Sequence, residues 1–465
     1  MTESFAKESR SEKDYARIFA PIVMITAGLF TWAIRGQAGY GAIPGCVFAG
    51  TLWGVTWFLF SKEESAVKSR RYGLGWSVFA FIFGIGISGM QGWGDIVSLI
   101  RGELLYNTDP NMVMEVSMAW GLFYVFWLGF HWAGTGSLLL AWTGSKRPIK
   151  PKDWIYRFLS MALGALAFFG MLSIFPQIML PKYSELNGYN FSTYNGLADL
   201  YGEIQAALIF SGAVAGGLIY EIIKKDKLNI KMILIPALTT AILWMFLIVL
   251  WENVVPAWAD DVGLSFNWWR CWESTGGGAI GLGFGIAFVV CNKQLPEDHP
   301  EQRERRFTSK PNGERLIGVY GALMVGLVYS TVQSIKGALH IAYPEVEALD
   351  STQLGWFLPV ATIFLLIWLI LIFKTSQQPY TIKDERDTTA EFGTIYIFTY
   401  LLMRELGLQV TYALNFNFSE LAFFVYYLIL AAIDIILVLL WAVKAHNLKL
   451  GPKIRNIFAM MKPTR

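Results

Sequence analysis

The sequence has little charge for its length, and this shortage excludes an ordinary soluble protein. Only 16% of its 465 residues are charged, whereas 54% are hydrophobic, and a soluble domain averages about 25% charged residues. No stretch combines enough charge with regular alternation to form a large water-soluble module. Much of the apolar surface must therefore face lipid, and the sequence predicts an all-α polytopic membrane protein.

Cysteine and histidine are scarce as well. The three cysteines, Cys46, Cys271 and Cys291, form no CxxC pair, and no histidine has a spacing suited to zinc. Neither a disulfide framework nor a metal site is expected, and no cofactor is implied. The apolar run after the charged N-terminal segment lacks a small-residue cleavage site, so it is predicted to remain as the first membrane helix.

Twelve apolar runs can be drawn as membrane helices, because every backbone amide in lipid must be satisfied within its own segment, although the eighth run is short and the fourth is long. They lie at 18–34, 42–60, 73–91, 112–142, 154–180, 199–223, 230–252, 276–291, 316–336, 355–374, 392–413 and 420–443. The chain is thus divided into a cytoplasmic segment 1–17, a six-helix half 18–223, a linker 224–231, a second six-helix half 232–443 and a basic tail 444–465.

The basic residues support this count and predict an orientation. Lys and Arg near helix ends stay on the cytoplasmic side. With the N-terminus placed inside, 32 of the 38 Lys and Arg residues fall in inside segments and 6 in outside segments. A missing or extra helix would scramble this alternation. Both termini are therefore predicted to be cytoplasmic, in a multi-pass protein of a plasma (inner) membrane.

Similar patterns occur in the same order in both halves. Arg35 precedes Gly41-Ala-Ile-Pro-Gly45, and Arg270 precedes Gly278-Ala-Ile-Gly-Leu-Gly283. Their shared order predicts two parallel six-helix repeats. In helix count, topology and repeat order this architecture resembles the major facilitator type of secondary transporter. The Gly-x-x-x-Asp-Arg motif of that family is absent between residues 61 and 72, so no residue roles are carried over from it.

Polar residues gather toward the predicted outer ends of the helices, where a substrate could bind. Two arginines, one from each half, could clamp a carboxylate or phosphate between their planar guanidinium groups. The alternative is that each arginine snorkels to the lipid headgroups. Tryptophans beside them could stack on a ring or belong to an interface belt. The predicted substrate-binding residues are Trp32, Arg35, Gln37, Gln91, Trp269, Arg270, Gln333 and Arg404.

Ionisable side chains at membrane depth cost roughly 2.5–3.5 kcal/mol each on insertion scales, so they usually face a cavity or a partner. Carboxylates and imidazoles in such places can bind a coupling ion. For His131, the stronger alternative is that its ring is hydrogen-bonded and serves helix packing. The predicted ion-coupling residues are Asp95, Glu203, Glu273, Glu405 and His131.

Two glycine-rich segments follow the two arginines. Gly281, Gly283 and Gly285 are interpreted as a small-residue face for helix packing. The run Gly276-Gly-Gly278 is less regular and could be an unwound helix start whose amides point at an anion.

The leading functional hypothesis is secondary active transport of a small polar or anionic solute, such as an organic acid or acidic sugar, in symport with a proton or sodium ion. The two halves would rock around a site between them. The expected partners are this solute, the ion and membrane lipid, with no nucleic acid. The alternative is a membrane-embedded transferase or hydrolase with its site at the outer face, because charge crowds at one face and not at the midplane.

The predicted topology can be tested with single cysteines and a reagent that does not cross the membrane. We expect cysteines at Lys68 and Arg305 to react only after the cells are opened, and cysteines at Lys182 and Asp260 to react in intact cells. Reaction of Arg305→Cys and Lys182→Cys from the same side would contradict the twelve-span topology.

Overall fold

The computed structural model describes residues 14–35, 43–61, 70–92, 94–105, 113–147, 149–189, 195–264, 268–295 and 418–446, together with residues 266 and 318. Apart from residue 318, the predicted spans 316–336, 355–374 and 392–413 lie outside these residues. The described part is mostly helical.

Six helical runs among the described residues are long and apolar enough to cross a membrane. They are formed by α1 (Ala16–Arg35), α6 (Pro151–Ile174), α8 (Asn195–Ile223), α11 (Trp268–Cys291), α17 (Phe418–His446), and α9 (Lys227–Val249), which runs on through η2 (Leu250–Val254) and α10 (Val255–Asp261). These helices indicate a membrane-embedded protein. The described residues show neither twelve spans nor a repeat.

The other described elements are shorter or less apolar. They are α2 (Ile43–Ser61), α3 (Trp76–Ser88), α4 (Ile96–Ile100), β1 (Glu103–Leu105), β2 (Val113–Glu115), α5 (Met118–Thr143) and α7 (Pro176–Met179). Helices α2, α3 and α5 nevertheless lie on predicted runs. The two strands form a small antiparallel hairpin between α4 and α5.

Several helix ends differ from the predicted ones for local chemical reasons. The run 112–142 becomes helical only at Met118, because the Ser117 hydroxyl caps α5 by accepting from the amide of Ala119. The run 154–180 breaks at Phe175, since Pro176 disfavours helical geometry in the residue before it. The run 230–252 begins earlier, because the Asp226 carboxylate caps α9.

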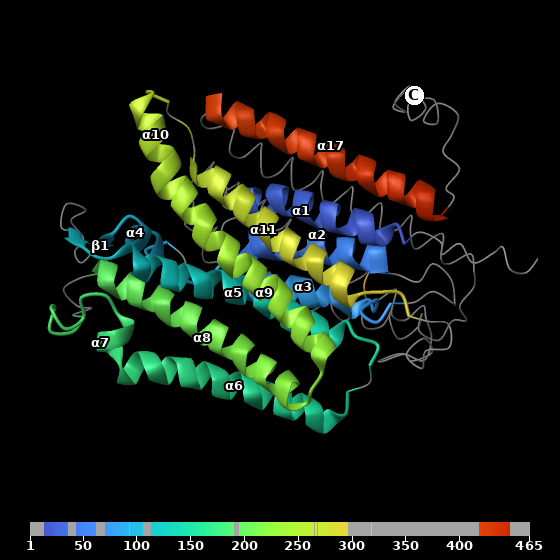
Figure 1. The fold of residues 1–465 in the computed structure, drawn as a ribbon, viewed down its shortest axis with the longest axis horizontal. Helices are drawn as coiled ribbons and strands as arrows, with labels where there is room; N and C mark the ends of the chain where they lie inside the picture. The colour runs from blue at the N-terminus through green and yellow to red at the C-terminus, as the bar shows by residue number, and fades with distance from the viewer. Residues whose placement is uncertain are drawn as a thin grey trace, which may run out of the picture.

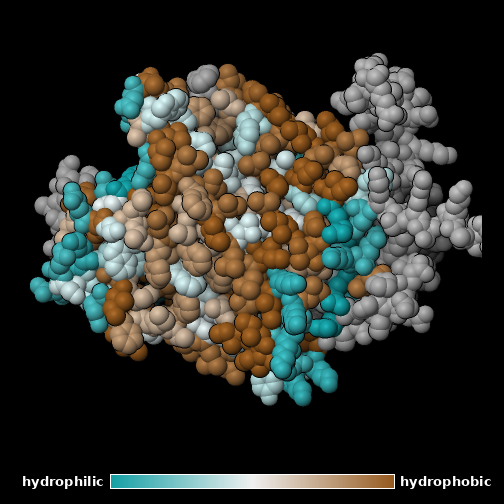
Figure 2. Space-filling model, viewed as in Figure 1, coloured by the Kyte–Doolittle hydropathy of each residue, from teal (hydrophilic) through white to brown (hydrophobic). Residues whose placement is uncertain are grey.

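The helices are arranged around a central group, with one helix on each flank. Figure 1 shows α17 along the top edge and α6 along the bottom, with α1, α11, α5 and α9 between them. Helix α6 packs chiefly against α8, and α17 against α1. Figure 2 shows hydrophobic surface across the middle of the visible face and hydrophilic patches toward its left and right ends. This distribution fits a molecule with an apolar belt between two polar ends.

The most extensive helix packing joins α1 and α11, which run antiparallel. A Cβ added at Gly28 would lie 2.1 Å from the carbonyl oxygen of Gly277, and one added at Gly281 would lie 2.1 Å from that of Met24. Only glycine permits such an approach between backbones. Gly276 to Gly278 lie within the continuous helix α11, so the unwound helix start considered above is wrong. Gly277 packs against the backbone of α1 as Gly281 does.

We expect Gly277→Ala to destabilise the protein by about 1–3 kcal/mol, because overpacking must push two backbones apart. The added Cβ would lie 2.2 Å from the carbonyl oxygen of Gly28. Thermal unfolding of the purified protein measures the effect. The matched control is Gly170→Ala in α6, where no atom lies within 4 Å of the added Cβ. Alanine favours helix there, so equal losses in the two variants would contradict the packing argument.

Candidate functional site

A buried charge cluster lies where α1 ends beside the start of α11. Arg35 is the last residue of α1, and Arg270 and Glu273 lie in the first turns of α11. The antiparallel packing places these ends together. Arg35, Arg270 and Glu273 are 4%, 8% and 2% exposed, so all three charges are removed from solvent.

Arg35 is held loosely for a buried arginine. Its Nη2 lies 3.7 Å from the Glu273 Oε1, and its Nη1 lies 3.9 Å from the sulfur of Cys46. Its Nε has no hydrogen-bond partner. The guanidinium lies 4.6 Å and 5.4 Å from the ring centroids of Trp32 and Trp132, so the π faces of both rings also stabilise its charge. Donor capacity therefore remains for a further acceptor.

Glu273 interacts with both Arg35 and Arg270, the two arginines predicted to clamp an anionic substrate. The charges of both Arg35 and Arg270 act on it, and the indole of Trp269 donates a hydrogen bond to it. The Arg270 guanidinium also lies 5.6 Å from the ring centroid of Phe423 in α17. In the structure, the anion between the two arginines is thus a side chain of the protein itself.

Tryptophans enclose this cluster. The ring centroid of Trp132 lies 5.3 Å from that of Trp32 and 4.6 Å from that of Trp244, which lies 4.9 Å from that of Trp272. All four side chains are fully buried. Trp32 therefore belongs to the core and not to an interface belt. Such a wall lowers the local dielectric, which strengthens the charge interactions inside it.

A cavity of about 670 Å³ opens beside the cluster, between the end of α3 and the first turns of α8. Arg35 lines it together with Gln91, Asp95 and Glu203. Sequence reasoning missed one further lining carboxylate, Asp199. Its position four residues before Glu203 on a helix was the available signal. The described lining thus carries three carboxylates and one guanidinium.

The loop before α4 folds tightly over Glu203. The Glu203 Oε2 accepts a hydrogen bond of 3.1 Å from the amide of Ile96, at the start of α4. Gly94 has a φ of +44°, and a Cβ there would lie 2.6 Å from the Glu203 Oε1. Glycine is needed for both the backbone angle and the close approach. Helix α3 ends at Ser88, three residues before the end of the predicted run 73–91.

Asp95 lies in this loop, outside the membrane-spanning helices. Burial, and then the negative charge of Asp199, raise the pKa of Asp95 above its ordinary value. A carboxyl group with a raised pKa keeps its proton to a higher pH than usual. Asp95 is therefore suited to exchange a proton with a substrate or with solvent.

The structure brings most of the described candidates together. Trp32, Trp269 and Arg270 lie with Glu273 in the buried charge cluster, Gln91, Asp95 and Glu203 line the cavity, and Arg35 belongs to both groups. His131 is not among the cavity-lining residues; it is fully buried, with its ring centroid 5.6 Å from that of Phe210. The remaining candidates, Gln37, Gln333, Arg404 and Glu405, lie outside the described residues.

Comparison with known proteins adds no assignment. The chain matches no protein-family model, no curated protein and no solved structure. The function must therefore be argued from the geometry of the site.

We expect Arg35→Gln to lower the free energy of unfolding by about 3–5 kcal/mol, because it removes the positive charge that acts most strongly on the buried Glu273 carboxylate. Glu273→Gln should also destabilise, and the double variant should lose less than the sum. Denaturant unfolding in micelles measures these differences.

The control for this cycle is Lys182→Gln. Lys182 pairs with Glu185, whose side chain is 61% exposed, so the expected loss is at most about 1 kcal/mol. Strict additivity of the Arg35 and Glu273 losses would contradict the coupling between the two charges.

Proposed function

We propose that the protein is a secondary transporter of a small polar or anionic solute, coupled to a proton or sodium ion. The observation that carries the proposal is the cavity lined by Arg35, a buried guanidinium with an unused donor, together with three carboxylates. Arginine is suited to holding a carboxylate or phosphate group. The cavity lies at one end of the apolar helices, with α8 contributing its first turns to the lining.

The charge of the cavity supports coupling to a cation. An anionic group bound at Arg35 would lie near Asp95, Asp199 and Glu203. Two like charges 4 Å apart repel by about 4 kcal/mol at an effective dielectric constant of 20. A proton or sodium ion on one carboxylate relieves this repulsion, so solute and cation should bind together. A zwitterionic solute meets the same requirement with its own positive group.

A membrane-embedded transferase or hydrolase is the second candidate. It is favoured by one observation, the raised pKa of Asp95 in a cavity that also contains Glu203. A carboxyl group of this kind can act as a general acid beside a second carboxylate. Chemical analysis of the solute after incubation separates the two candidates, because a transporter returns it unchanged.

The transport proposal is tested in proteoliposomes with radiolabelled succinate, gluconate and glutamate under an imposed proton or sodium gradient. We expect Arg35→Lys to weaken solute binding about tenfold or more, because the lysine loses the planar fork of donors. Asp95→Asn should abolish gradient-driven accumulation and leave solute exchange intact. Wild-type uptake should fall as pH rises through the raised pKa of Asp95, and Asp95→Asn should remove that fall.

The matched control is Asp260→Asn, an exposed aspartate of α10 that does not line the cavity. It should transport like the wild type. Normal binding by Arg35→Lys together with normal accumulation by Asp95→Asn would rule out this site for transport. Conversion of a solute into a product would favour the enzyme.

A further inference from the structure

A second cavity, of about 480 Å³, lies at the opposite end of the helices. It is formed by the end of α5, the start of α6 and the turn from α8 to α9. Charge sorting predicts this end to be cytoplasmic. Its lining carries more positive than negative charge, with Asp153, Glu221 and Asp226 against six basic residues, Arg71, Arg147, Arg157, Lys224, Lys225 and Lys227.

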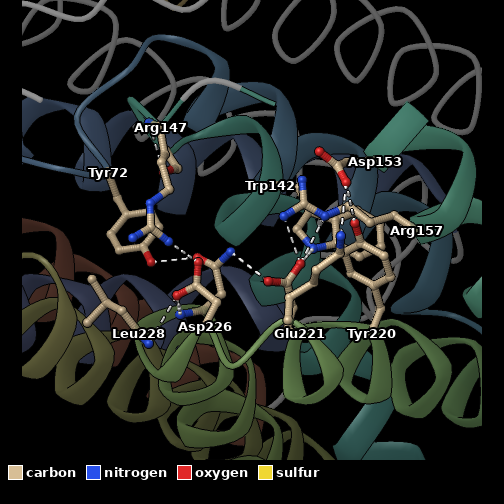
Figure 3. A network of polar contacts seen from close by, with 12 residues as sticks. Tyr72, Trp142, Arg147, Asp153, Arg157, Tyr220, Glu221, Asp226 and Leu228 are labelled. Carbon is tan, nitrogen blue, oxygen red and sulfur yellow. Dashed lines mark hydrogen bonds and ion pairs between the residues drawn. The ribbon is translucent and has the colours of Figure 1, made fainter. Parts of the chain in front are cut away.

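The three carboxylates of this basic pocket are already engaged (Figure 3). Glu221 accepts hydrogen bonds from Arg157 and also from Trp142 and Asn229. Asp226 caps α9 and pairs with Arg147. Asp153 accepts from the hydroxyl of Tyr220 at 3.0 Å and from Lys224 at 3.3 Å. These contacts leave an excess of positive charge for an external anion.

Arg157 is the strongest sign of a missing ligand. It is only 6% exposed, and Glu221 engages its Nε at 2.9 Å and its Nη2 at 2.8 Å. Its Nη1 is buried and has no hydrogen-bond partner. The guanidinium lies 5.2, 5.8 and 5.5 Å from the ring centroids of Trp142, Trp154 and Tyr220. A rigidly held donor without an acceptor costs free energy unless a ligand supplies one.

Lys225 and Lys227 line the same pocket without an ion pair in the part of the chain that the structure describes. They follow each other closely in the turn between α8 and α9 and are free to contact a bound anion. Such basic groups near a membrane surface attract anionic headgroups.

Helices α6 and α8, which line the pocket, also expose apolar side chains to their surroundings. On α6 the side chains of Ile155, Phe158 and Leu159 are 66%, 55% and 51% exposed, and at the end of α8 Ile223 is 70% exposed. A ligand held here would therefore place one part in a basic pocket and another against an apolar helix face.

We propose that the basic pocket binds the phosphate-bearing headgroup of an anionic phospholipid, whose acyl chains lie along α6 and α8. The phosphate accepts from Arg157, and Lys225 and Lys227 neutralise the net charge. The same phosphate chemistry exists in soluble phosphate esters, but only a lipid also covers the apolar face. This site is separate from the cavity at Arg35 and independent of the proposed transport.

Native mass spectrometry of the purified protein in detergent tests the proposal with three probes. These are dioctanoyl phosphatidylglycerol, dioctanoyl phosphatidylcholine and sn-glycerol 3-phosphate. We expect the anionic lipid to bind more tightly than the zwitterionic lipid, and the soluble ester to bind more weakly than either. The double variant Lys225→Gln/Lys227→Gln should weaken binding of the anionic lipid about tenfold or more.

The matched control is Lys150→Gln/Lys152→Gln, which removes the same charge from two exposed lysines at the start of α6 that do not line the pocket. It should bind the anionic lipid like the wild type. Three results would overturn the proposal: equal affinity for the two lipids, equal losses in the two double variants, or binding of glycerol phosphate as tight as that of the anionic lipid.

Discussion

The close contact between α1 and α11 is the constraint on which the rest of the structure depends. In lipid, helices gain little from hydrophobic burial, so their association rests on van der Waals packing and on polar contacts between them. Gly28 and Gly277 let the two backbones approach until a single added carbon would collide with a carbonyl oxygen. This contact fixes the antiparallel alignment and brings Arg35 beside Glu273, although they are far apart in sequence.

The two ends of the molecule each contain a buried arginine paired with a glutamate, and the two pairs differ in tightness. Arg157 is fixed by Glu221 at 2.8 Å and 2.9 Å, and a chain of hydrogen bonds continues from Glu221 through Asn229 to Tyr72. Arg35 approaches Glu273 only to 3.7 Å. The first geometry stabilises the fold, whereas the second leaves a charge that can change partners. Transport is therefore proposed at the looser pair.

Sequence patterns predicted the helices better than their ends or contacts. The apolar runs predicted where the described membrane helices lie, because a helix that spans lipid must have a certain length and an apolar composition. Helix ends depended on single residues such as Ser117 and Pro176, which an average over a run cannot resolve. The sequence predicted that polar residues gather toward one end of the helices. It did not predict that Glu273 lies between the two arginines, because the repeat pattern treated Arg35 and Arg270 as equivalent residues that bind an external anion. Pairing between distant helices depends on how they pack.

Arg35 connects solute binding to helix packing, because it belongs both to the cavity and to the α1–α11 contact. Under the proposed function, an anionic group that draws the guanidinium into the cavity leaves the Glu273 carboxylate with less compensation in a buried place. The resulting free-energy cost destabilises the contact between α1 and α11. A proton on Glu273 removes that cost, and so would a shift of Arg270 toward it. Under the same proposal, solute binding at Arg35 is linked to proton uptake or to helix movement, and either response changes which state of the protein is favoured.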